Sequence, residues 1–170
     1  TEEGVTDYAP YVNIFGRNNG GWADGAVILP YFHYRMYGNK DIIYDNLELM
    51  QKHIHASSRT AKDGIREQSA YGDWLNIGAD TPLDVFCTAY HYYSLSLYLY
   101  LLNEIGKNDT EAGLEKEKTY KAFRSNFIDK DGRVKGDTQT AYVLSYAFGL
   151  LEKEPAAKHL RRKFEESGML

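Results

Sequence analysis

Three polar and aromatic clusters recur along the chain, each just before or at the start of an unusually apolar segment. They occupy residues 21–24 (Gly-Trp-Ala-Asp), 71–74 (Tyr-Gly-Asp-Trp) and 137–140 (Asp-Thr-Gln-Thr). A tryptophan ring offers a flat apolar face on which a sugar ring can stack, and carboxylate and amide groups exchange hydrogen bonds with hydroxyls. The clusters therefore favour a carbohydrate-binding site as the leading hypothesis.

The first two clusters supply four candidates for sugar contacts, Trp22, Asp24, Asp73 and Trp74. Each has a structural alternative. Asp24 would cap a helix while Trp22 packs beside it, and Asp73 would organise a loop while Trp74 fills the core. Repetition of the pair at equivalent places strengthens the sugar hypothesis but leaves the structural alternative open.

Three further polar residues have weaker claims. The amide of Gln139 could serve sugar hydroxyls, or Gln139 could be a capping partner or a plain surface residue. Glu67 and Asp84 lie close to the second cluster, and carboxyl pairs carry out glycoside hydrolysis. Their alternatives are a solvated loop charge for Glu67 and, for Asp84, a first-turn position favoured by the helix dipole.

The composition of the 170 residues excludes several other classes. The formal net charge of -4 comes without a basic block, so we expect no nucleic-acid partner. The single Cys87 rules out an intrachain disulfide and a thiolate metal cluster, and the histidines show no metal spacing, so we expect no metal and no other cofactor. No stretch reaches the roughly 18 apolar residues of a membrane helix, so no membrane partner is expected. The compartment stays open between cytoplasm, periplasm and secretion.

The apolar spacing predicts six helices that alternate between apolar on most sides and amphipathic. Thr81 is expected to cap the third helix, and Pro30 predicts a kink or a late start in the first. The sixth helix carries the apolar residues Ala157, Leu160 and Phe164 amid charged ones. The expected helices cover about residues 25–37, 41–55, 81–105, 110–128, 138–151 and 154–166.

This alternation predicts an all-α fold in which helical hairpins form a toroid, with an inner and an outer ring, or a solenoid. Residues 1–170 would form a single region, with an N-terminal loop over 1–24 and hairpins over 25–56, 81–128 and 138–168. Stacked hairpins place equivalent positions at one end of the stack. The three clusters should therefore gather around one rim.

Residues 21–30, Gly-Trp-Ala-Asp-Gly-Ala-Val-Ile-Leu-Pro, resemble the Trp-x-Asp-small-x-x-x-x-Pro segment of bacterial α-L-rhamnosidases, glycoside hydrolase family 78. Tyr34 and the pair Tyr37-Gly38 follow in the same pattern. The resemblance spans nearly the whole chain in the right order, and it continues through residues 72–74, 81–83, 88–90 and 138–141.

The resemblance implies an (α/α)6-barrel catalytic domain that removes terminal α-L-rhamnose with inversion, a reaction that uses two carboxyl groups roughly 6.5 to 9.5 Å apart. The family's acid and base motifs have no match here, which implies a central part of the barrel with about three of six hairpins and no catalytic residue. We therefore expect the isolated chain to be inactive. Trp22 and Trp74 match residues that line the rhamnose pocket, and Asp24, Asp73 and Gln139 are further carry-overs.

Two other functions remain open, another (α/α)6 glycoside hydrolase and a non-enzymatic helical-repeat interaction module. A panel of sugars separates a rhamnosidase from a hydrolase that acts on another sugar, and the interaction module should respond to no sugar. An incomplete ring also leaves two hairpin flanks uncovered, and exposed apolar flanks tend to associate. We therefore expect a homodimer or aggregation of the isolated chain.

Overall fold

The computed structural model describes residues 18–67, 71–74, 76 and 78–168, and these form helices joined by loops. Within them the only extended pairings are isolated bridges between Lys62 and Ile65 and between Ile128 and Val134. This confirms the all-α class. None of the helices in the described part of the chain has the length and apolar character to span a membrane. The helices are α1 (Gly25–Tyr37), α2 (Asp41–Thr60), α3 (Leu83–Glu104), α4 (Thr110–Phe127), α5 (Gln139–Ala147) and α6 (Lys153–Ser167).

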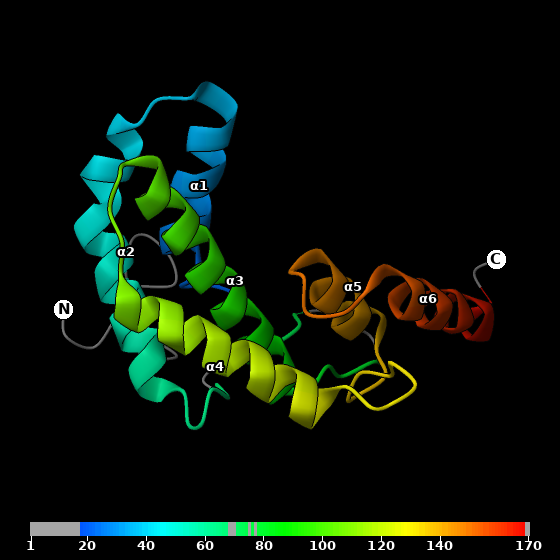
Figure 1. The fold of residues 1–170 in the computed structure, drawn as a ribbon. Coiled ribbons are helices and arrows are strands. Elements are labelled where there is room, and N and C mark those ends of the chain that lie inside the picture. The colour runs from blue at the N-terminus through cyan, green and yellow to red at the C-terminus, as the bar shows by residue number, and fades with distance from the viewer. Residues whose placement is uncertain (1–17, 68–70, 75, 77, 169–170) are drawn as a thin grey trace.

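The helices pair as three hairpins, α1 with α2, α3 with α4 and α5 with α6. Figure 1 shows α3 between the first hairpin and α5, and contacts of α1 and α5 with α3 join the hairpins. Thus α1, α3 and α5 form an inner row, and α2, α4 and α6 lie outside it. This is the alternation expected for part of an (α/α)6 toroid.

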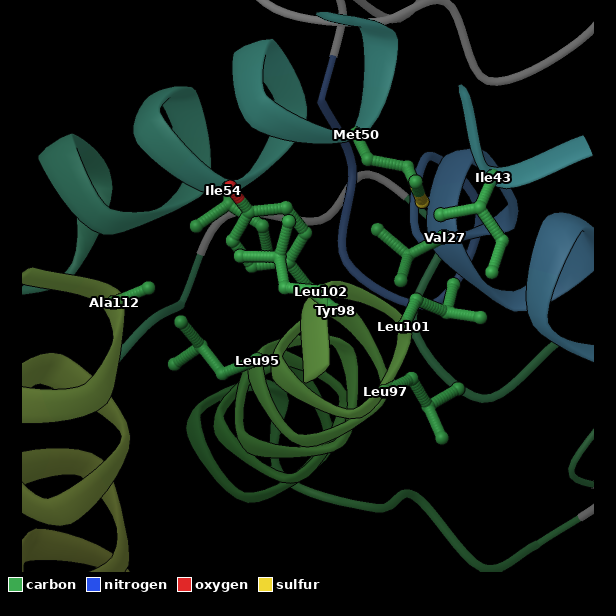
Figure 2. Packing of buried hydrophobic residues seen from close by; sticks show 10 residues of the cluster. All are labelled: Val27, Ile43, Met50, Ile54, Leu95, Leu97, Tyr98, Leu101, Leu102 and Ala112. Atoms are coloured by element: carbon green, nitrogen blue, oxygen red, sulfur yellow. The ribbon is translucent and has the colours of Figure 1, made fainter. Parts of the chain in front are cut away.

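The helix α3 is apolar on most sides because it contributes to two cores. In the first, side chains from α1, α2 and α4 meet the C-terminal half of α3 (Figure 2). In the second, the N-terminal half of α3 packs against α4, α5 and the residues around them. The first contains Val27, Ile43, Met50, Ile54, Leu95, Leu97, Tyr98, Leu101, Leu102 and Ala112. The second contains Val85, Ala89, Phe123, Phe127, Val134, Ala141, Tyr142, Leu150, Leu151 and Ala156.

Two expected helix ends were wrong. The helix α2 continues to Thr60 rather than ending near His55, and buries Ala56 and Ser57 in its extra turn. The helix α5 ends at Ala147 rather than near Leu151. Gly149 adopts a left-handed φ of +79°, which lets the backbone N–H groups of Leu150 and Leu151 turn back to the carbonyl of Ser145.

The apolar residues noted in α6 are not the ones that the structure buries. Ala157 is exposed, Phe164 is largely exposed, and Leu160 is only half-buried. The buried side chains of α6 are Ala156 and His159, one position earlier in the helical turn. The imidazole of His159 stacks on the Tyr142 ring of α5, which explains the rotation.

The expectations for Pro30 and Thr81 gave mixed results. Pro30 is buried inside α1, which begins at Gly25, so the helix does not start late. Thr81 does not cap α3, whose N-terminal flanking residue is Pro82. The Thr81 hydroxyl instead donates to Asp73 and lies 2.7 Å from the Thr138 hydroxyl. Thr81 thus connects two of the polar clusters.

Candidate functional site

Three aromatic rings from two separate segments meet at the rim where α1 begins. Trp22 lies 4.7 Å from Tyr71 and 6.2 Å from Trp74, measured between ring centroids, and Tyr71 lies 5.9 Å from Trp74. The Trp22 and Trp74 rings meet edge to face, and they are 40% and 58% exposed. We call Trp22, Tyr71 and Trp74 the aromatic platform. It offers apolar ring surface to solvent, as sugar stacking requires.

The turn that carries Trp22 depends on two glycines packed against α3. A Cβ on Gly20 would lie 2.9 Å from the Cys87 sulfur, and one on Gly21 would lie 2.6 Å from a Phe86 ring carbon. Gly21 also has a left-handed φ of +84°. Only glycine meets both the steric and the conformational demand at position 21. This close approach places Trp22 at the beginning of α1.

Asp24 follows Trp22 by two positions in the chain and is completely buried. Its Oδ2 accepts a hydrogen bond from the Gly21 backbone N–H at 2.7 Å. Its Oδ1 accepts one from the Ser94 hydroxyl at 2.6 Å and lies 3.0 Å from Nε2 of His53. The Arg66 guanidinium lies 3.6 Å from Oδ2. Asp24 precedes α1 without a side-chain capping bond to it, so the capping alternative does not describe this carboxylate.

The surroundings of Asp24 keep it ionised. Burial by itself would raise its pKa, but the hydrogen bond and charge of His53, the charge of Arg66 and the Ser94 hydroxyl outweigh burial and hold the pKa well below its usual range. Because an ionised carboxylate only accepts, Nε2 of His53 carries the proton in that contact. The network is a buried charge pair with hydrogen bonds on both carboxylate oxygens.

Asp73 and Gln139 come together at a neighbouring cavity of about 640 Å³. The Thr81 hydroxyl donates to Asp73 at 2.9 Å, and Thr138 beyond it caps α5 by accepting from the Ala141 backbone N–H. The second and third clusters are therefore joined through hydroxyl groups. The cavity is lined by Asp73, Asn76, Gly78, Ala79, Asp80, Gly136, Asp137, Thr138, Gln139, Thr140, Lys163, Glu166 and Ser167.

The cavity lining is acidic overall. Its four carboxylates, Asp73, Asp80, Asp137 and Glu166, face one ammonium, that of Lys163. This ammonium lies 3.0 Å from Glu166 and 3.8 Å from Asp137. Burial opposes ionisation of Asp137, but hydrogen bonds from Tyr142 and Arg162 outweigh it and lower its pKa. Amide, hydroxyl and carboxylate groups in such a lining suit a neutral, hydroxyl-rich ligand.

The structure gives no support to the two carboxylates weighed as catalysts. Glu67 is exposed, and Asp84 pairs with Lys135 while accepting from the Val85 backbone N–H. A general acid at neutral pH needs a raised pKa. Among the described residues, clear pKa shifts of carboxyl groups are downward, as at Asp24, Glu115 and Asp137.

No group of three or more His, Cys, Asp or Glu side chains in the described ranges could hold a metal ion. The sulfur of Cys87 is buried, and burial raises the pKa of its thiol to about 12, so it is no nucleophile.

Sequence reasoning missed several members of the site. Tyr71 was noted within the second cluster but not predicted as a ring of the platform. His53, Ser94 and Arg66 were not predicted as partners of Asp24. Ser94 carried a weak local signal, a small hydroxyl residue in a mostly apolar helix, which it shares with Thr88 and Ser96.

The comparisons with known proteins agree with each other. A family model described as the bacterial alpha-L-rhamnosidase 6 hairpin glycosidase domain matches residues 1–169. The chain is 38% identical over 167 residues to an alpha-L-rhamnosidase of Alteromonas sp. and 35% identical over 152 residues to one of Streptomyces avermitilis. Each match covers 89% of this chain but only 18% and 15% of the respective relative. The chain therefore spans less than a fifth of the length of these relatives.

A solved structure shows the same fold. The crystal structure of Streptomyces avermitilis alpha-L-rhamnosidase complexed with L-rhamnose matches with a TM-score of 0.93 and 32% sequence identity. The match covers 99% of this chain and 17% of that one. The three hairpins thus occur as part of a longer chain in that enzyme.

Proposed function

Because the chain belongs to the bacterial α-L-rhamnosidase six-hairpin glycosidase domain family, we propose that it supplies the sugar-binding part of a glycoside hydrolase. The enzyme would remove terminal α-L-rhamnose from glycosides or polysaccharides by inverting hydrolysis. The observation that carries this proposal is the contact between Trp22 and Trp74, two exposed rings brought together from separate loops.

The aromatic platform suits the apolar side of rhamnose. Rhamnose is a deoxysugar whose methyl group takes the place of a hydroxymethyl group, so part of its surface is apolar. Trp22 and Trp74 present ring surface at two steeply different angles, 77° apart. Such a corner would hold both a ring face and the methyl group, and burial of both surfaces from water would favour binding.

The hydroxyl groups of the substrate would bind Asp73 and Gln139. Asp73 lines the cavity and directly precedes Trp74 of the platform in the chain. The carboxylate would accept from sugar hydroxyls, and the Gln139 amide would both donate and accept. Asp24, the remaining candidate for sugar contact, has no exposed surface, so its part in the site is indirect.

We propose that both catalytic groups come from outside these residues. Inverting hydrolysis needs an acid that protonates the leaving oxygen and a base that takes a proton from the attacking water. The described carboxylates near the platform are ion-paired, hydrogen-bonded or turned to solvent. The chain would then hold sugar and orient it without turnover. Release of the aryl group from an aryl α-L-rhamnoside by the purified chain would contradict this.

The exposed apolar residues of the end helices support a larger ring. On α1, Leu29 and Met36 are each 72% exposed and Phe32 is half exposed, whereas α3 between the end helices buries most of its apolar side chains. On α5, Val143 and Tyr146 are exposed as well. We propose that further hairpins of a six-hairpin barrel cover these faces.

The same exposed faces would make the 170-residue chain associate when it is alone, as a dimer through its hairpin flanks. Light scattering over a range of protein concentrations measures this. A monomer of unchanged mass at the highest concentration would contradict the association.

Fluorescence titration tests the sugar site directly. The chain has only two tryptophans, and both belong to the platform, so its emission has no distant source. L-Rhamnose is expected to cause a saturable change, and L-fucose, D-mannose and D-glucose a weaker one. Trp74→Phe leaves Trp22 as the reporter, and Trp22→Phe leaves Trp74 as the reporter. Both changes should weaken rhamnose binding. Each change should cost on the order of tenfold in affinity.

A matched control is Tyr37→Ala, because Tyr37 is an exposed aromatic residue at the other end of α1. It should bind rhamnose as the parent chain does. Selective binding of another sugar would favour a different (α/α)6 glycosidase. No response to any sugar, even when the missing hairpins are supplied in a longer protein, would favour the helical interaction module.

A further inference from the structure

One buried side chain, Arg66, contacts the loop that carries Trp22 from a segment that precedes Trp74 in the chain. Its guanidinium donates to the backbone carbonyl of Asn18, in the loop before Trp22, and lies 3.6 Å from the Asp24 carboxylate. Its own backbone belongs to the segment that leads to Tyr71 and Trp74. There the Thr88 hydroxyl of α3 accepts from the Arg66 N–H and donates to the Arg66 carbonyl.

Asp24 completes this connection on the Trp22 side. Its carboxylate accepts from the N–H of Gly21, the residue before Trp22, and also binds α2 through His53 and α3 through Ser94. The turn from residue 18 to 24 contains two left-handed positions, Asn18 at φ +60° and Gly21 at φ +84°. A turn of this shape needs tertiary contacts to persist, and these hydrogen bonds supply them.

We propose that Asp24 and Arg66 are positioning residues that set the distance and tilt between Trp22 and Trp74. The pair locks the two loops together beneath the platform, so the sugar contacts the rings while the carboxylate stays buried. This inference depends on the proposed function only for the identity of the ligand. The ring geometry itself can be measured without any sugar.

The geometric test is near-ultraviolet circular dichroism, read at the long-wavelength edge where only tryptophan absorbs. Two coupled tryptophans give a signal there that depends on their mutual orientation. Asp24→Asn keeps the size of the side chain but replaces an acceptor oxygen with an NH₂ group. It should lose most of this tryptophan band and make the rings more accessible to acrylamide, while far-ultraviolet circular dichroism shows the helices intact. Rhamnose affinity should fall roughly ten- to a hundredfold.

Asp24→Asn leaves Arg66 buried opposite a neutral group, and the variant could fail to fold for that reason. A milder variant covers this case. Ser94→Ala removes one hydrogen bond to Oδ1 and keeps the ion pair, so it should shift the tryptophan band in the same direction by a smaller amount. The double variant Asp24→Asn, Arg66→Gln removes both charges. It should recover stability relative to Asp24→Asn but leave the tryptophan band altered, which a merely stabilising pair would not do.

The matched control is Asp84→Asn, which removes a carboxylate of the first turn of α3 whose partners are Lys135 and the Val85 N–H rather than members of the network. It should leave the tryptophan band unchanged. Two results would overturn the positioning role. One is an altered tryptophan band in the control, and the other is that folded network variants match the parent chain in tryptophan band and acrylamide quenching. A third outcome is that the network variants lose the tryptophan band but the parent chain does not bind rhamnose. That outcome would uphold the positioning role and count only against the proposed function.

Discussion

Replacing Gly21 with alanine tests whether the turn that carries Trp22 is held by its close contact with α3. The new Cβ would lie 2.6 and 2.7 Å from two ring carbons of Phe86, closer than van der Waals contact allows. The Phe86 ring is buried and packs at 4.9 Å on Tyr90, so a shift of the ring would disturb that contact. Either the turn or the ring must shift.

The chain contains a matched control for this change. Gly38, after α1, has a left-handed φ of +69° like the +84° of Gly21, but a Cβ there would meet nothing within 4 Å. Both substitutions bear the backbone penalty of a left-handed alanine, about 1 kcal/mol. Only Gly21→Ala adds overpacking, typically about 1–3 kcal/mol. We therefore expect Gly38→Ala to lower the free energy of unfolding by about 1 kcal/mol and Gly21→Ala by about 2–4 kcal/mol.

Urea denaturation followed by far-ultraviolet circular dichroism measures both free energies, and tryptophan emission reports on the platform in the same samples. Gly21→Ala should also change the emission of the folded protein, because the displaced backbone is next to Trp22. Gly38→Ala should leave emission unchanged. Equal losses of stability for the two variants would refute the reasoning, since the backbone penalty alone would then account for both.

Four further outcomes are expected. Cys87 should react with a thiol reagent only as the chain unfolds, because it is buried with its pKa raised to about 12, and labelling of the native chain would contradict this. Asp109→Ala should lower the free energy of unfolding in urea by about 1 kcal/mol, since it removes the capping bond to the Ala112 N–H. The pKa of folded Asp24 is lowered, so its contribution to stability is complete above the usual value of 3.8 and is lost as the pH falls below it. Asp24→Asn should therefore show a shallower loss of stability below that pH in acid titrations of unfolding. The acidic cavity beside Gln139 should disfavour anionic saccharides. A neutral disaccharide should therefore displace a bound rhamnoside at a lower concentration than its uronate analogue does, and the difference should be larger at low salt.

Much of the fold could be predicted from the sequence because helix periodicity is a local property. The helix α4 illustrates this, since its buried residues Thr119, Phe123 and Phe127 recur every four positions in the sequence. The helix α6 shows where the local pattern is not enough. Ala156 and Ala157 are adjacent and equally apolar, so composition does not say which faces the core. The stacking of His159 on Tyr142 decides it, and that contact depends on the partner helix.

The gathering of the clusters also followed from topology, since consecutive hairpins place their loops at one end. The structure brings Trp22 to Trp74 and Asp73 to the cavity that Gln139 lines. The burial of Asp24 could not be predicted in this way. Its partners come from α2, α3 and the segment after α2, at separations of 29, 70 and 42 residues (53 − 24, 94 − 24 and 66 − 24). No local pattern in the sequence relates such distant positions.

The placement of aromatic and charged groups has a physical reason that links the fold to the site. Stacking on a sugar needs ring surface open to water, and exposed rings have few contacts of their own to hold them in one orientation. A buried carboxylate and guanidinium are in the opposite situation, because separating them would leave a charge unpaired in the protein interior, at a cost of about 3–5 kcal/mol. Their geometry is therefore much harder to disturb than that of the rings. The Asp24–Arg66 pair holds the Gly21 N–H and the Asn18 carbonyl of the Trp22 loop, and under the proposed positioning role it transfers that rigidity to a surface that could not supply it alone.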